Sequence, residues 1–215
     1  MRVRFTILVL LALLVSQSAF AATPTIGVWP DSTHAKLVPL PKIHAQPHPF
    51  WGRRSVQVGA GLVGAGVVLT SADLQTRQLR HDYLPTFRYK YDDYLQFAPA
   101  VATVALKALG VESRSSWERM VVSDALSVGS MLSVVYAVKH GLGRLRPDGS
   151  THNSFPSGHT AMAFTSATIL HKEYGHLSPW VSIAGYSAAT ITGISRSLNN
   201  RHWLSDIVVG AGVGM

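Results

Sequence analysis

Six apolar segments, each long enough to form a helix, fill the chain after Arg54. They lie at residues 55–72, 97–111, 120–138, 160–170, 177–195 and 203–215. None shows a sustained alternation of apolar and polar residues, so the pattern predicts helices and not the strands of a half-buried sheet. We therefore expect an all-α protein in which residues 55–215 form a six-helix bundle.

These segments are compatible with two settings, a lipid bilayer and the interior of a soluble bundle. Residues 59–61 and 64–66 both read Gly-Ala-Gly, and small residues of this kind let membrane helices approach closely. The segments are only just long enough to cross a bilayer, and several carry a charge. We expect a membrane-associated bundle and keep a soluble periplasmic bundle as the alternative.

The start of the chain has the three parts of a secretory signal peptide. Two arginines precede a short aliphatic stretch, and residues 19–21 (Ala-Phe-Ala) fit the small-x-small pattern of a cleavage site. We expect residues 1–21 to be removed on export to the periplasmic side of the cell envelope, with an uncleaved anchor as the alternative. Residues 22–54 are rich in proline and histidine and are expected to form an irregular linker.

The chain has no cysteine and a formal net charge of +8. An exported protein without disulfides must be held by packing or by a membrane. The positive charge suits an anionic substrate or anionic lipid, although a generic basic surface would explain it equally well. No cysteine or histidine spacing indicates a metal site. We expect no metal and no nucleic-acid partner, and nothing marks an oligomeric state.

A basic cluster, KHGLGRLRP, follows the third apolar segment. Lys139 and Arg146 are seven residues apart, about two helical turns, so they could share one face of a helix. Arg144 lies between them. Cations beside apolar segments need an anionic partner, although a basic helix end would also explain this cluster by itself.

The stretch SFPSGHTAMAF places a histidine at the expected start of a helix. Pro156 suits the first turn of a helix or the turn before it. Ser157 and Gly158 then present backbone N–H groups at the helix start, where the helix dipole favours an anion. His159 would lie beside that anion as a proton donor. A histidine that merely caps the helix is the alternative.

In the third cluster, SRSLNNRHWLSD, Arg196 precedes His202 and Asp206. At positions i and i+4 of a helix, His202 and Asp206 would lie on one face. A carboxylate on one imidazole nitrogen fixes the tautomer and leaves the other nitrogen as a positioned nucleophile. A surface His–Asp pair is the alternative. Together, the three clusters supply what a phosphoryl group needs: cations, N–H donors, a nucleophile and an acid.

Read together, these clusters resemble the signature of the type 2 phosphatidic acid phosphatase and vanadium haloperoxidase superfamily. That signature is Lys-x6-Arg-Pro, Pro-Ser-Gly-His and Ser-Arg-x5-His-x3-Asp, and each position is matched here with the right spacing. The resemblance covers roughly residues 55–215. The stretches RPDGSTHNSFPSGHT and NNRHWLSD look like the bacterial lipid phosphatase branch of this superfamily.

The resemblance implies a six-helix phosphatase that needs no metal or other cofactor. It makes His202 the nucleophile that forms a phosphohistidine, Asp206 the residue that orients it, and His159 the acid and later the base. The residues implied to hold the phosphate are Lys139, Arg146, Ser157, Gly158 and Arg196. In this branch, the phosphorylated lipid substrates include phosphatidic acid, phosphatidylglycerol phosphate, undecaprenyl pyrophosphate and lipid A phosphates.

Three alternatives remain at this point. The first is a soluble, broad-specificity acid phosphatase of the periplasm with the same site. The second is a vanadium-dependent haloperoxidase, because the same signature holds vanadate in those enzymes, although their chains are usually much longer. The third is a non-catalytic transport or binding protein of the membrane, which would not need a complete set of two histidines and a carboxylate.

Overall fold

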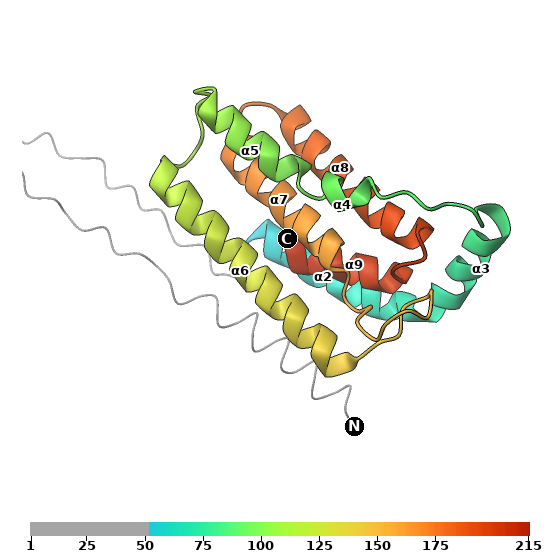
Figure 1. Cartoon of the computed structure of the whole chain (residues 1–215). Coiled ribbons are helices and arrows are strands. Elements are labelled where there is room, and N and C mark those ends of the chain that lie inside the picture. Colours follow the sequence, from blue (N-terminus) through green and yellow to red (C-terminus); the bar gives the residue numbers. More distant parts are fainter. Residues whose placement is uncertain (1–51) are drawn as a thin grey trace, which may run out of the picture.

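The computed structural model describes residues 52–215, and the regular elements within this range are all helical (Figure 1). They are α2 (Arg54–Val68), the 3₁₀ helix η3 (Leu69–Ala72), α3 (Asp73–Tyr83), α4 (Asp92–Leu95), α5 (Ala98–Ala108), α6 (Trp117–Leu142), α7 (Gly158–Tyr174), α8 (Pro179–Leu198) and α9 (Leu204–Gly214). The all-α prediction is confirmed for this part of the chain. The expected signal peptide and nearly all of the expected linker lie outside the described residues.

Each of the six predicted apolar segments contains a helix, and two further helices were not predicted. The first, α3, has the polar sequence DLQTRQLRHDY and continues directly from α2 through η3. Hydrophobic periodicity does not reveal a helix that is so polar. The second, α4, is one turn of four residues, which is too short to produce a periodic pattern.

Helix α9 is surrounded by α2, α7, α8 and α6, and its C-terminal end lies in the middle of the bundle (Figure 1). The helices α2 and α9 run antiparallel. A Cβ atom on Gly59 would lie 2.8 Å from the carbonyl oxygen of Gly212, and one on Gly66 would lie 2.9 Å from the amide nitrogen of Val209. The two backbones are therefore in direct contact, which side chains at these glycines would prevent.

Helix α7 lies in the centre of the bundle, against α8, α9, α5 and α6. Small side chains allow this close packing, because Ala163 and Ala167 of α7 and Ala189 of α8 form one fully buried cluster. On another side of α7, a Cβ atom on Gly210 of α9 would lie 2.6 Å from the carbonyl oxygen of Ser157. The start of α7 is thus held directly against α9.

Two helical stretches of the described chain are long and apolar enough to cross a membrane. They are residues 54–83, which join α2, η3 and α3, and α6. Of the most apolar 18 residues in each stretch, only 11% are buried inside the bundle in the first and 22% in the second. Large apolar side chains of α6 such as Val121, Leu126 and Leu132 are exposed. This outward-facing apolar surface fits the predicted membrane association.

Candidate active site

The site residues predicted from the sequence gather at one end of the bundle, where α6 and α8 end and α7 and α9 begin (Figure 1). Two backbone hydrogen bonds join these segments. Ser154 N–H donates to the Arg144 carbonyl oxygen over 2.9 Å, and Ser157 N–H donates to the Asp206 carbonyl oxygen over 2.9 Å. The loop after α6 is therefore tied both to itself and to the start of α9.

His202 lies in the tight turn that joins α8 to α9. Asn200 has a left-handed φ of 59°, which asparagine tolerates better than most residues. The amide groups of Arg201 and His202 then donate to the carbonyl oxygen of Arg196 over 3.0 and 3.3 Å. The expectation that His202 and Asp206 share a helix is wrong, because α9 begins only at Leu204.

The His202–Asp206 pair nevertheless forms. His202 Nδ1 lies 3.6 Å from Asp206 Oδ2, and both side chains are almost fully buried. Burial lowers the pKa of His202 to about 4, Asp206 opposes this shift, and the positive charges of Lys139 and Arg196 add to it. His202 is consequently neutral at physiological pH, with a lone pair available on one ring nitrogen, as a nucleophile requires.

A buried network holds Asp206. Its carboxylate accepts hydrogen bonds from Ser154 Oγ and from Arg144 Nη1, the latter over 2.9 Å. Arg144 Nη2 also donates to Asp73 Oδ2 over 2.6 Å. Asp73 in turn accepts from the N–H and the hydroxyl of Ser205 over 3.0 and 2.6 Å. Burial alone would raise the pKa of Asp206, but the contacts with His202, Ser154 and Arg144 outweigh it and lower that pKa.

The sequence analysis did not select Asp73 or Ser154. Asp73 lies outside the three clusters, and Ser154 opens the second cluster but precedes the Pro-Ser-Gly-His motif. Arg144 was noted only as a cation in need of an anionic partner. The structure supplies that partner twice, with Asp73 and Asp206. Arg144 therefore supports the His–Asp pair, and its charge is compensated within the protein.

Lys139 and Arg146 are both held by Asn153. Lys139 Nζ donates to the Asn153 carbonyl oxygen over 2.6 Å, and Arg146 Nε donates to Asn153 Oδ1 over 3.0 Å. The expectation that the two cations share a helical face is wrong, because α6 ends at Leu142 and Gly143 turns the chain with a φ of 56°. Within residues 52–215, neither cation forms a salt bridge, so both charges are free for a bound anion.

The start of α7 offers amide groups to the same region. Ser157 is the N-cap, and its Oγ accepts from the N–H of Thr160 over 3.5 Å. The N–H of Ser157 was expected to be available to an anion, but it donates to the backbone carbonyl oxygen of Asp206. The amides of Gly158 and His159 occupy the first positions of the helix and have no acceptor within it. Together with the helix dipole, they favour an anion at this end.

Arg196 completes the set of cations from the last turn of α8. Its side chain is only 8% exposed, and Nη1 donates to Asp92 Oδ2 over 2.8 Å and lies 3.3 Å from Asp93 Oδ1. Its Nε is buried and has no hydrogen-bond partner among the described residues. Because a buried, unpaired donor is costly, this atom indicates a place for an oxygen atom of a ligand.

His159 lies beside this arginine, with Nε2 3.0 Å from Asp93 Oδ1. Burial is the main cause that lowers the pKa of His159, and Arg196 lowers it further, whereas Asp93 and Asp92 oppose the shift. The site thus combines a neutral buried histidine, a second histidine in contact with a carboxylate, and three cations around helix N–H groups. This arrangement suits a tetrahedral oxyanion such as phosphate. Among the described residues, no group of His, Asp and Glu side chains is arranged to hold a metal ion.

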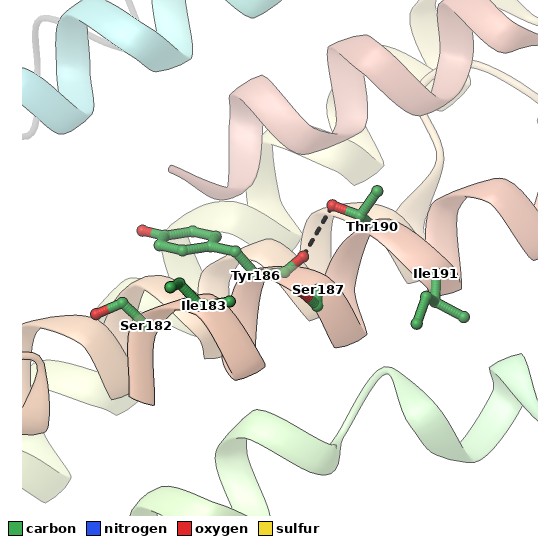
Figure 2. A pocket seen from close by; sticks show the side chains of 6 residues that line it. All are labelled: Ser182, Ile183, Tyr186, Ser187, Thr190 and Ile191. Atoms are coloured by element: carbon green, nitrogen blue, oxygen red, sulfur yellow. Dashed lines mark hydrogen bonds between the residues drawn. The ribbon is translucent and has the colours of Figure 1, made fainter. Parts of the chain in front are cut away.

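An open, mainly apolar groove runs along the outer face of α8, on the helix that also carries Arg196 (Figure 2). Figure 2 shows its lining, which is Ser182, Ile183, Tyr186, Ser187, Thr190 and Ile191. Ile191 lies five residues before Arg196 in the helix, which corresponds to about 7.5 Å along the axis. At 3.6 residues per turn, the two side chains point about 140° apart, so the groove lies on the exposed face of α8 and Arg196 on a buried one.

A helical bundle that brings a buried His–Asp pair, a second histidine and cations without salt-bridge partners to one end has the features of a phosphate-binding site. In agreement with this, residues 120–215 match the PAP2 superfamily. The predicted resemblance to this superfamily is confirmed.

The chain is also 43% identical over 202 residues to a lipid A 1-phosphatase of Porphyromonas gingivalis. The alignment covers 94% of this chain but 41% of the relative, so the chain spans less than half of that protein's length. No solved structure matched the chain.

Proposed function

We propose that the protein is a phosphatase that removes a phosphate group from a lipid through a phosphohistidine on His202. The observation that carries this proposal is the buried His202, which is neutral because its pKa is lowered to about 4. It lies beside an aspartate that can stabilise the positive ring formed during attack. The cations Lys139, Arg146 and Arg196 surround the same end of the bundle.

In the first step, the free ring nitrogen of His202 attacks phosphorus and the bond to the leaving oxygen breaks. His159 gives its proton to that oxygen, so the lipid leaves as an alcohol. The three cations, the amides of Gly158 and His159 and the hydroxyl of Ser157 stabilise the charge on the phosphoryl oxygens. The developing charge on His202 is balanced by Asp206.

In the second step, His159 is neutral and accepts a proton from a water molecule, whose oxygen attacks the phosphohistidine. The phosphorus–nitrogen bond breaks, inorganic phosphate forms, and His202 returns to its neutral state. His159 has then regained the proton that it donated, so the cycle is closed without a metal or other cofactor.

Two observations support a lipid as the substrate. The described bundle exposes apolar side chains along α2 and α6, and an open, mainly apolar groove runs along the exposed face of α8. The related protein from P. gingivalis is a lipid A 1-phosphatase, so the 1-phosphate of lipid A is the first substrate we propose. Phosphatidic acid, phosphatidylglycerol phosphate and undecaprenyl pyrophosphate are the next candidates.

The direction of the helices supports a site at a membrane surface. Helices α2 and α6 both run towards the site, since α2 is antiparallel to α9 and α6 leads into the loop that carries Arg146. A bilayer crossed by these two helices would therefore have the site at one of its surfaces. The expected export, and not the direction of these helices, is the ground on which we propose the periplasmic side of the cell envelope.

Purified protein in detergent micelles tests this proposal. We expect wild-type protein to release phosphate from the 1-position of lipid A in the presence of chelators, and His202→Ala to release none. His81→Ala is the matched control, because His81 lies on α3 with its side chain 80% exposed. Near-normal activity of His202→Ala would contradict the assignment of the nucleophile.

Membranes from cells that express the protein separate the soluble acid phosphatase from the lipid phosphatase. A soluble enzyme would be released when membranes are extracted with carbonate, and it would prefer small phosphate esters. We expect the protein to remain with the membrane and to prefer the lipid. The apolar outer surfaces of α2 and α6 favour this outcome.

A further inference from the structure

Asp93 lies at the point where two groups of the proposed phosphate site meet. Its Oδ1 is 3.0 Å from Nε2 of His159 and 3.3 Å from Nη1 of Arg196. It comes from α4, the single turn between α3 and α5, which is far in sequence from the three clusters around residues 139–206. Nothing in the signature of those clusters requires a carboxylate here.

The neighbouring residue Asp92 already compensates Arg196. Asp92 is 1% exposed, its Oδ2 accepts from Arg196 Nη1 over 2.8 Å, and its Oδ1 accepts from Asn199 Nδ2 over 3.1 Å. This residue therefore ties α4 to the end of α8 and balances the arginine. Asp93, with about half of its side chain exposed, is left to act on His159.

We propose that Asp93 is a positioning residue for His159, holding the ring by Nε2 and keeping it protonated until Nδ1 passes its proton to the leaving oxygen. This inference rests on the proposed phosphatase function. The negative charge of Asp93 acts in one step of the reaction, in which the lipid leaves as an alcohol. Asp93 itself neither gains nor loses a proton in that step, because the proton moves from His159 to the leaving oxygen as the phosphorus–oxygen bond breaks.

The surroundings of His159 show why such a partner is needed. A general acid must carry its proton at the working pH, yet burial and the charge of Arg196 on α8 both lower the pKa of His159. Lys139 of α6 adds a positive charge at the start of α7, where its Cε would lie 3.8 Å from a Cβ on Gly158. Within residues 52–215, only the carboxylates on α4 act directly on the ring in the opposite sense.

The other helices packed against α7 do not change this balance. Helix α9 brings His202 and Asp206 to this end, and these two form a pair of their own. The one ionisable residue of α5 is Lys107, which lies in its last turn. Among the described residues, Asp93 is therefore the group whose removal should most affect the proton on His159.

Asp93→Asn tests the inference with two substrates of different leaving groups. A lipid phosphate releases a poor alkoxide and needs the acid, whereas p-nitrophenyl phosphate releases a stable phenolate and needs it little. We expect Asp93→Asn to lower kcat for the lipid phosphate at pH 7 by about 10- to 100-fold, which is no more than the smallest contribution typical of a general acid, because His159 itself remains. The loss with p-nitrophenyl phosphate should be several times smaller.

The pH profile gives an independent readout. Loss of the carboxylate removes a contribution that raises the pKa of His159, so the alkaline limb of kcat/KM should move to lower pH. In a His159→Gln background, adding Asp93→Asn should cause no further loss, because both changes remove the same function. Asp93→Glu retains the charge, so it should keep the alkaline limb near its wild-type position if Asp93→Asn does not fold.

Asp82→Asn is the matched control, since Asp82 contacts His81 on the exposed face of α3 in the same kind of pair. An equal loss on both substrates with an unchanged pH profile would overturn the inference, and so would additive losses in the double variant. A lower KM with unchanged kcat would also overturn it, because Asp93 would then only occupy the anion site. The proposed function fails separately, if wild-type protein releases no phosphate or His202→Ala remains active.

Discussion

His202 Nδ1 lies 3.6 Å from Asp206 Oδ2 although the two residues do not belong to one helix. The contact arises because Asp206, in the first turn of α9, folds back over the helix start, where its Oδ2 accepts the N–H of Trp203 over 2.9 Å. One carboxylate thus caps α9 and faces the imidazole. The position of His202 is therefore coupled to the formation of the helix that follows it.

The burial of His202 predicts a stability loss on mild acidification. Its pKa is about 4 in the folded protein and 6.5 ordinarily, so the unfolded chain binds more protons between these pH values. Stability should be unaffected above pH 6.5 and should fall by roughly 1 kcal/mol per pH unit as the pH drops towards 4. The thermal unfolding midpoint of His202→Asn should depend less on pH in this range than that of the wild-type protein. The same slope in both proteins would contradict the buried neutral state, and His81→Asn serves as the control.

Arg144→Met should destabilise the protein strongly. The substitution leaves Asp73 and Asp206 buried without their shared cation, a change that costs about 3–5 kcal/mol for buried pairs. Phosphatase activity should also fall, because Asp206 loses a hydrogen bond that orients it. Arg201→Met removes a more exposed pair with Asp148 and should cost no more than about 1 kcal/mol. Similar unfolding midpoints for the two variants would refute the proposed role of Arg144.

Gly210→Ala should lower both stability and activity. The new Cβ would lie 2.6 Å from the carbonyl oxygen of Ser157, so the start of α7 must move away from α9. Gly64→Ala is the matched control on α2, where a Cβ would meet nothing within 4 Å, and it should be neutral or stabilising by up to about 1 kcal/mol. Unfolding midpoints and phosphate release are the measurements, and equal behaviour of the two variants would show that the close approach is unimportant.

If the groove on α8 contacts the lipid, a polar residue in it should raise KM for a lipid phosphate but not for a soluble one. Ile191→Asn should raise KM for a lipid phosphate by about tenfold, which corresponds to about 1.4 kcal/mol of lost apolar contact. The KM for p-nitrophenyl phosphate should stay within twofold. Leu132→Asn, on the exposed face of α6, controls for general effects of a polar residue on the outer surface. A parallel change on both substrates would exclude the groove as a lipid contact.

Much of this architecture could be predicted from the sequence, because long apolar helices leave a clear pattern. The positions of α2, α5, α6, α7, α8 and α9 follow from such segments. The helix α3 could not be found in this way, since its residues are mainly polar and its helical state depends on continuation from α2. Asp73 at its start was missed for the same reason, although it binds Arg144 and Ser205.

The site residues that belong to local sequence motifs could be predicted. The residues that come from distant segments could not. Lys139, His159, Arg196 and His202 belong to clusters with recognisable spacing. Asp93 comes from a single-turn helix more than sixty residues before His159, and no local pattern indicates that contact. The same limit explains the wrong helical assignment of His202, because the turn that buries it depends on hydrogen bonds back to Arg196.

The most direct test of the central claim is to trap the phosphoryl group on the enzyme. Wild-type protein is mixed with a lipid labelled in its phosphate, quenched in base within milliseconds, digested and analysed by mass spectrometry. We predict a base-stable, acid-labile phosphohistidine on the peptide that contains His202, and no label in His202→Ala. Turnover without labelled protein, or label on another residue, would contradict the account.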